Sequence, residues 1–191
     1  MAKIAGVSLL IITDATERET ALDLLIRGNS AQIDDPAFVR ELKHWIRFNP
    51  AEATATGDGL FTRTTGNPTV PTWIGERMCG IVFTKKSENA RYPAQLRSSS
   101  GIAIFVGDKP DHEHWVKVGR CFERFALQAS ALGIRHAHLN QLVEVPAARA
   151  EFARWLGIGT ARPDLCVRFG MAPPMPASLR RPVADVVAVA A

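Results

Sequence analysis

A long amphipathic segment in the second half of the chain gives the clearest periodic pattern. Apolar residues recur there at three- and four-residue steps, which predicts one long helix with a single apolar stripe. The stripe consists of Trp115, Val118, Phe122, Phe125, Ala129 and Leu132. Leu127 and Ala131 add apolar surface off this stripe, so we expect the helix to be buried on more than one side. Gly133 should end the helix, because glycine adopts the left-handed C-cap conformation at little cost.

Four apolar runs predict strands. Three of them cover residues 6–13, 101–106 and 164–169. The first is almost continuously apolar, which is typical of a strand covered on both faces. A fourth run begins at Ile134, directly after the long helix, and leads into the polar pair Asn140–Gln141. A helix that feeds such a strand can build one wall of a cofactor pocket.

Capping signals place the other helices. Asp35–Pro36 is a start signal, and the helix that follows should end near Phe48, where Asn49–Pro50 terminates it. Val145–Pro146 begins another helix, and residues 72–84 can form a short apolar one.

Two segments lack such periodicity. Residues 51–71 are rich in threonine, glycine and proline, and we interpret them as an ordered lid or binding loop rather than a disordered linker. Residues 170–191 form a proline-rich C-terminal arm. Helices and strands otherwise alternate with short connections and without a repeat. The sequence therefore predicts an α/β or α+β fold, with residues 1–191 as a single domain.

Composition narrows the class of protein. The chain has 191 residues and a net charge of +4, but its basic residues are scattered rather than gathered in a stripe, which argues against nucleic-acid binding. No apolar stretch is long enough to cross a bilayer, which argues against a membrane protein. The three cysteines, Cys79, Cys121 and Cys166, are widely spaced and odd in number, so we expect reduced thiols in a cytoplasmic protein.

The histidines do not predict a metal centre. His112 and His114 stand two apart at the start of the long helix, so they should point to different sides and be solvated. His136 and His138 share one strand face, but no third ligand has a suitable spacing, and we expect no metal. The chain also lacks a nucleophile elbow and a glycine-rich dinucleotide motif.

Two polar pairs are candidates for ligand binding. Arg180–Arg181 lies at the end of the proline arm, where two guanidinium groups can hold a phosphate through charge-assisted hydrogen bonds. The alternative is a solvated basic tail. Asn140–Gln141 can likewise line a ligand or form a plain turn.

Taken together, the motifs resemble the nitroreductase family of FMN flavoproteins, and most nearly its Acg-like branch, in which two nitroreductase-like halves are fused. The matching segments are Phe38–Trp45 with Asp58–Leu60, Trp115–Arg120 with Glu123–Arg124 and Leu127–Gly133, Leu139–Gln141 with Val143–Pro146, and Arg168–Gly170 with Pro173–Pro174 and Arg180–Pro182. Each segment alone is only weakly specific for this family, whereas the order and spacing of the segments together are fairly specific.

The resemblance implies an α+β fold, a nitroreductase-like sheet sandwiched by helices, with FMN held where two halves meet. It implies that Leu139, Asn140 and Gln141 line the flavin ring and that Arg180 and Arg181 reach the flavin phosphate. The family's Arg-x-Ser-x-Arg motif and its Pro-Ser-x-x-Asn-x-Gln-Pro-Trp segment are absent, so we expect the fold to be incomplete at the N-terminus.

Three functions are consistent with this resemblance. The first is an FMN-dependent oxidoreductase that transfers a hydride from NAD(P)H through the flavin to nitro-aromatics or quinones. The second is a flavin-binding or flavin-sequestering protein without turnover, and the third is a half-protein that needs a partner chain. We expect a homodimer or a pairing with a second chain, because apolar residues remain beyond the main stripes. These residues are Leu127, Ala131, Trp73, Ile74, Met78, Ile81 and Phe83.

Overall fold

A computed structural model describes residues 4–187, apart from the side chains of residues 79–82. The chain divides into two compact units. The sheet unit contains the chain up to Asp34 together with Lys85–Pro173, and the insertion unit contains Asp35–Thr84 and the chain from Pro174 onward. The single domain expected over residues 1–191 stays a prediction.

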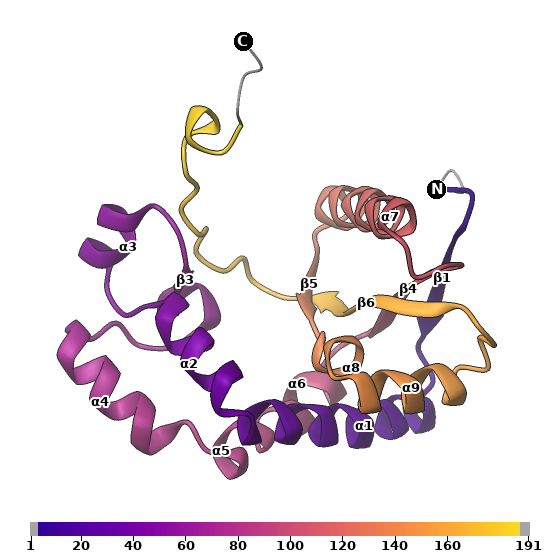
Figure 1. Ribbon diagram of the computed structural model, residues 1–191, viewed down its shortest axis with the longest axis horizontal. Helices are drawn as coiled ribbons and strands as arrows, with labels where there is room; N and C mark the ends of the chain where they lie inside the picture. The colour runs from indigo at the N-terminus through magenta and orange to yellow at the C-terminus, as the bar shows by residue number, and fades with distance from the viewer. Residues whose placement is uncertain (1–3, 188–191) are drawn as a thin grey trace. The chain divides into compact units, whose positions relative to one another are not determined.

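An antiparallel four-stranded sheet forms the centre of the sheet unit (Figure 1). Its strands, in spatial order, are β1 (Val7–Ile12), β4 (Gly101–Gly107), β6 (Arg162–Met171) and β5 (Ile134–His138). Every residue of β4 is buried, because this strand has neighbours on both edges and helices over both faces. All four predicted strands are therefore present.

Helices cover the two faces of this sheet unequally (Figure 1). On one face, Ile104 of the sheet packs against Leu25 and Phe152, which come from the layer of helices on that side. None of these three residues is exposed to solvent. The helices of this side are α1 (Ala15–Asp34), α6 (Tyr92–Arg97), α8 (Gln141–Glu144) and α9 (Pro146–Trp155), with α5 (Lys85–Asn89) beside α1 and α6. The long helix α7 (His112–Ala131) covers the other face. This arrangement is the predicted α+β sandwich of a sheet between helices.

The expectation that the first strand is covered on both faces holds only in part, since Leu10 and Ile12 pack into the core on one face and Val7 and Leu9 into the core on the other. β1 is an edge strand, and Ile11 is 48% exposed while Ser8 is also exposed. The helical layers extend over the middle of the sheet and cover its edge only in part. A branched apolar run therefore identified the strand but not its position in the sheet.

The predicted long helix is present, and the middle of its apolar stripe packs on β4, whereas Trp115 and Leu132 at the two ends of the stripe are 40% and 60% exposed. Phe122 and Phe125 contact the ring of Phe105 edge-to-face, with ring centroids 5.7 and 5.5 Å away. Gly133 follows the last turn with a φ of 72°, which confirms its role in ending the helix. The expected burial on more than one side is wrong for the single chain, because Leu127 is 65% exposed.

The interpretation of His114 as a solvated residue is also wrong. Its side chain is 9% exposed, because this first-turn position of α7 faces the sheet. The N-cap residue Asp111 accepts a hydrogen bond from the backbone N–H of His114 at 2.9 Å, and its Oδ1 lies 2.6 Å from the Nδ1 atom of the same residue. The carboxylate of Asp111 thus holds both the helix start and the imidazole.

We expect Asp111→Asn to flatten the acid limb of the stability profile. The hydrogen bond to the His114 side chain, and then that to its backbone N–H, lower the pKa of Asp111 below its ordinary value. A carboxyl group with a lowered folded pKa stabilises the fold above its unfolded pKa of about 3.9, and this stabilisation is lost as the pH falls through the folded pKa. Urea unfolding as a function of pH measures the effect. Asp23→Asn, which changes an exposed carboxylate of α1, is the control, and equal profiles for the two variants would contradict the assignment.

The insertion unit consists of short elements around one aromatic side chain. Its elements are α2 (Pro36–Trp45), β2 (Ile46–Arg47), α3 (Pro50–Thr56), β3 (Leu60–Phe61), the 3-10 helix η1 (Thr62–Thr65), α4 (Thr72–Val82) and the 3-10 helix η2 (Val183–Asp185). Phe48 is 8% exposed and packs against Gly75, where an added Cβ atom would lie 2.3 Å from the Phe48 ring. Only glycine fits at that position of α4.

Several boundaries in this unit differ from the sequence prediction. Asp35 caps α2 as predicted and accepts a hydrogen bond from Ala37 N at 2.8 Å, but the helix ends at Trp45. Asn49 and Pro50 do not terminate that helix; they begin α3, with the Asn49 side chain accepting from Glu52 N at 2.9 Å. Residues 51–71 are accordingly not a continuous loop, since they carry most of α3 and all of β3 and η1. Their role as a lid stays a prediction.

The remaining sequence predictions can be placed briefly. The C-terminal arm begins after Met171, because β6 continues to that residue. Cys121 and Cys166 are buried free thiols, as expected, whereas the side chain of Cys79 lies outside the described residues. Within residues 4–187, no helix has the length and apolar character needed to cross a membrane.

Candidate functional site

Three of the predicted site residues lie where β5 leads into α8 in the sheet unit, with Leu139 and Asn140 between the two elements and Gln141 as the first residue of α8. Leu139 is 1% exposed and belongs to the core, and its backbone N–H donates to Cys166 O at 2.8 Å. The carbonyl oxygen of Asn140 accepts hydrogen bonds from Val143 N at 2.9 Å and Glu144 N at 2.7 Å, which turns the chain into α8. The side chain of Leu139 is therefore inside the protein, and Asn140 remains half-buried.

The side chain of Gln141 is held by a chain of hydrogen bonds. Its Nε2 donates to Tyr92 Oη at 2.6 Å, and the tyrosine hydroxyl donates to Asn29 Oδ1 at 3.1 Å. Asn29 Nδ2 donates to Asn89 Oδ1 at 2.8 Å, and Asn89 Nδ2 donates to Ser30 Oγ at 2.9 Å. Each group donates to the next in one direction, so the amide orientation of Gln141 is fixed by α1, α5 and α6 together.

Two properties of this chain of bonds bear on ligand binding. Burial, and then the charge of Glu88, raise the pKa of Tyr92 to about 12, so the hydroxyl stays a neutral donor. At the other end, Gln141 Oε1 is buried and has no donor among the described residues. A buried acceptor without a partner is uncommon and marks a place where a bound molecule or an ordered water completes the network.

Sequence reasoning missed the residues that orient Gln141. Tyr92 is the only tyrosine in the chain, which is the one signal that could have singled it out. Asn29 and Asn89 stand in helices with no visible motif.

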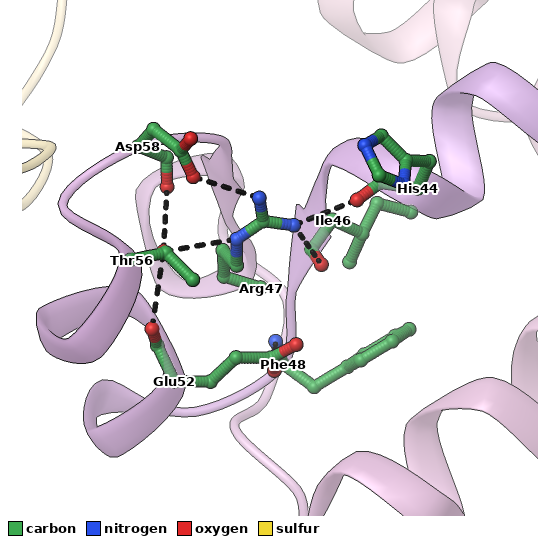
Figure 2. A network of polar contacts seen from close by, with 7 residues as sticks. All are labelled: His44, Ile46, Arg47, Phe48, Glu52, Thr56 and Asp58. Carbon is green, nitrogen blue, oxygen red and sulfur yellow. Dashed lines mark hydrogen bonds and ion pairs between the residues drawn. The ribbon is translucent and has the colours of Figure 1, made fainter.

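A buried arginine organises the insertion unit (Figure 2). The side chain of Arg47 is 9% exposed, and its Nη2 lies 2.7 Å from Asp58 Oδ1. Its Nε donates to Thr56 Oγ1 at 3.1 Å, and its Nη1 donates to the carbonyl oxygen of His44 at 2.7 Å. The hydrogen bond from Arg47 is the largest cause of the lowered pKa of Asp58. This arginine thus ties the end of α2 to the loop between α3 and β3.

We expect Arg47→Met to destabilise the insertion unit by about 2 kcal/mol, because it removes hydrogen bonds to a charged group. The cost is kept to this range because the Asp58 side chain is 29% exposed and water can solvate it. Methionine keeps the apolar stem of the side chain. Urea unfolding monitored by tryptophan fluorescence measures the change, since Trp45 and Trp73 lie in this unit. A midpoint equal to that of Arg63→Met, an exposed arginine of η1, would rule out a structural role for the network.

The two C-terminal arginines also lie in the insertion unit, and both are exposed. Arg180 Nη1 donates to Ser178 Oγ and to the carbonyl oxygen of Leu179. Arg181 passes over the C-cap of α3, because a Cβ atom added at Gly57 would lie 3.7 Å from its Cγ. Its charge also contributes to the lowered pKa of Asp58.

This arrangement leaves positive charge in excess. Asp58 is already engaged by Arg47, and within the described part of the chain neither Arg180 nor Arg181 forms an ion pair. Two consecutive exposed guanidinium groups, of which Arg181 lies near the already paired Asp58, favour an anionic ligand. The five predicted site residues therefore fall into two groups, Leu139, Asn140 and Gln141 in the sheet unit and Arg180 and Arg181 in the insertion unit.

The strand histidines take part in packing. The rings of His136 and His138 lie 5.4 and 5.3 Å from that of Phe122 on α7. Burial lowers the pKa of both imidazoles, which favours their neutral forms. Among residues 4–187, no group of three or more histidine, cysteine, aspartate or glutamate side chains is placed to hold a metal ion.

Comparison with known proteins identifies the fold. No family model matches the sequence, and no curated protein matches it either. Among solved structures, the chain resembles the FMN-dependent nitroreductase NfnB from Mycobacterium smegmatis, solved in complex with NADPH, with a TM-score of 0.55 and 10% identity over 97% of this chain and 79% of that one. A nitroreductase from Bacteroides fragilis with bound FMN gives a TM-score of 0.49 and 13% identity over 97% and 76% of the two chains. The fold is thus nitroreductase-like.

Proposed function

We propose that this protein is an FMN-dependent oxidoreductase of the nitroreductase type, from the Acg-like branch of that family. The observation that carries the proposal is the likeness in fold to NfnB over 97% of the chain. The exposed Arg180 and Arg181 support it, because they stand where an anionic group of a ligand can be bound. The buried free thiols of Cys121 and Cys166 fit a cytoplasmic protein.

The residues present fit FMN in two places. Arg180 and Arg181 would hold the phosphate, because each exposes a planar guanidinium group without an acidic partner among the described residues. Asn140 and Gln141 would line the polar edge of the flavin ring, and the unpartnered Gln141 Oε1 is an acceptor suited to a ring N–H group. Leu139 would contribute through the backbone, because its side chain is in the core. Residues 51–71 would form a lid.

FMN supplies the redox chemistry when it is bound, by accepting a hydride from NAD(P)H and passing it to a nitro-aromatic or a quinone. The chain itself binds and orients. Tyr92 accepts a hydrogen bond from Nε2 of Gln141, which orients the amide and leaves its Oε1 as an unpartnered acceptor for the ligand. No side chain is assigned as a proton donor.

Anaerobic reduction tests this function. Protein loaded with FMN should lose its visible flavin absorbance when NADPH is added and regain it on addition of a nitro-aromatic or a quinone. Bound flavin that NADPH leaves oxidised would replace this function with flavin binding without turnover. A protein that takes up FMN only with a second chain would indicate a half-protein.

We also propose a homodimer in which α7 pairs with the α7 helix of a second copy. Four exposed residues, Val116, Arg120, Glu123 and Leu127, form one stripe on its outer face at helical spacing. An antiparallel pairing centred between Cys121 and Phe122 places Val116 opposite the partner's Leu127 and Arg120 opposite the partner's Glu123. Gly119 has no atom within 4 Å of an added Cβ, so a second backbone can approach there. In this register the apolar side chains face each other and the opposite charges face each other across the same interface.

A second exposed apolar patch lies on α4 in the insertion unit, where Trp73 is 70% and Met78 is 47% exposed. We propose that this patch adds to the same assembly. The side chain of Ile81, which the sequence also suggested, lies outside the described residues.

A further inference from the structure

Two arginines of the sheet unit converge on one buried serine. Arg18 on α1 donates from Nη1 to the carbonyl oxygen of Ser99 at 2.6 Å and, at a longer 3.5 Å, to that of Leu96. Arg168 on β6 directs its Nη1 at Ser99 Oγ from 3.4 Å. Ser99 is 8% exposed and lies between α6 and β4. Side chains that are 150 positions apart in the sequence thus meet at one turn.

Neither of these two positive charges is bonded to a carboxylate in the described part of the chain, although Glu19 interacts electrostatically with Arg18. Neither Arg18 nor Arg168 forms an ion pair there, although both are half-buried. Glu19 is adjacent to Arg18 in the sequence, but both of its carboxylate oxygens are bonded to Arg97 at 2.8 Å. Such a cluster carries a charge of +2 beside a buried turn.

The environment of both groups favours an anionic partner. Arg18 Nε is buried and has no acceptor. Burial lowers the pKa of Arg168, and no acidic neighbour counteracts this effect. Arg168 also stands on β6, an interior strand of the sheet, where a charged side chain is costly to desolvate unless it is paired.

We propose that Arg18 and Arg168 together bind one oxyanion, the phosphate or carboxylate group of a small ligand, beside the turn formed by Ser98–Ser100. Two planar guanidinium groups that approach from different elements can each offer two parallel N–H donors to one such group. The inference does not rest on the proposed function, because it needs neither a flavin nor turnover.

Helix capping explains only part of this arrangement. Arg18 Nη1 satisfies carbonyl oxygens that follow α6, which is an ordinary role for a basic side chain at a helix end. Capping does not use Arg18 Nε, and it gives no partner to Arg168. A ligand anion accounts for both arginines.

Thermal unfolding with inorganic phosphate as the probe tests the inference. At a phosphate concentration near 100 times its Kd, the wild-type Tm should rise by about 5–10 °C above that in chloride of equal ionic strength. Arg18→Gln combined with Arg168→Gln should abolish this rise when both are made in a chain that also carries Arg180→Ala and Arg181→Ala, because the phosphate site proposed at those two exposed arginines then no longer contributes. Arg154→Gln, which changes an exposed arginine of α9, should leave it intact.

Two results would overturn the inference. One is a wild-type Tm that phosphate does not raise beyond chloride, a result that stands even if the double variant fails to fold. The other is a rise of equal size in a folded double variant. Arg168→Lys provides a milder variant, which should keep the charge but weaken phosphate binding because its ammonium group lacks the planar fork.

Competition distinguishes the two sources of the anion. If FMN displaces phosphate while riboflavin does not, the site binds the flavin phosphate. If phosphate binds equally well to protein saturated with FMN, the site takes a separate phosphate or carboxylate ligand. A wild-type protein that binds phosphate at this site but takes up no FMN would contradict the proposed function and leave this site in place.

Discussion

Replacing both Arg180 and Arg181 with alanine is expected to weaken FMN binding by about 3–6 kcal/mol, a loss of roughly two to four orders of magnitude in affinity. Each guanidinium group would donate charge-assisted hydrogen bonds to the phosphate, and each such bond contributes about 1.5–3 kcal/mol. Because both side chains are exposed and free of ion pairs among the described residues, their removal leaves no buried carboxylate behind.

Riboflavin makes this experiment specific, because it has the same ring but lacks the phosphate. Fluorescence titration should show that the double variant loses affinity for FMN and keeps the wild-type affinity for riboflavin. Arg63→Ala, at another exposed arginine of the insertion unit, should change neither. An unchanged FMN affinity in the double variant would mean that the arginines form a solvated tail.

Leu127→Asp is expected to raise the dimer dissociation constant by about two to four orders of magnitude. In a twofold interface every substitution acts twice, so removing two apolar contacts and burying two carboxylates costs about 3–6 kcal/mol in total. Leu127 is 65% exposed in the single chain, so the monomer should fold normally. Sedimentation equilibrium measures the constant.

Charge reversal tests the register of the α7 pairing. Arg120→Glu should weaken the dimer because it faces the partner's Glu123, and adding Glu123→Arg in the same chain should restore it. Because the double variant also regains the wild-type net charge, Arg120→Glu combined with Glu17→Arg, at an exposed glutamate of α1, is the control and should not restore the dimer. A wild-type protein that sediments as a well-folded monomer at micromolar concentration would contradict the proposed dimer altogether.

Local periodicity predicted the main elements of the sheet unit well, because they are long enough to show a regular pattern of apolar residues. The stripe on α7 and the glycine at its end needed only the sequence between Trp115 and Gly133, and the apolar run over residues 101–106 predicted the strand β4. Order in the sheet could not be predicted in this way. The first apolar run became the edge strand β1, since pairing with β4 depends on residues about a hundred positions later.

The insertion unit was harder to predict because its stability depends on polar contacts between short segments. Asn49–Pro50 carries the signal for the end of one helix and for the start of the next, and only the bond from Glu52 N to the Asn49 side chain decides between them. From the sequence alone, Arg47 would be expected at the surface, because arginine is mostly exposed in proteins. Its burial follows from the later Thr56 and Asp58, whose oxygens it binds.

The sequence could suggest candidate site residues, but it could not predict which other side chains they contact. Asn140 and Gln141 could be singled out by their place after a strand. The partners that orient Gln141 could not, because Tyr92 and Asn29 come from helices far away in the sequence. The same limit applies to Arg18 and Arg168, which no local pattern links.

The visible absorbance spectrum of purified protein, incubated with FMN and then passed through gel filtration, tests the central claim most directly. A flavoprotein of this type should elute with roughly one flavin per chain, and its bound flavin should show a spectrum shifted from that of free FMN, because the ring leaves water for a protein environment. A colourless protein that elutes folded and free of FMN would contradict the account.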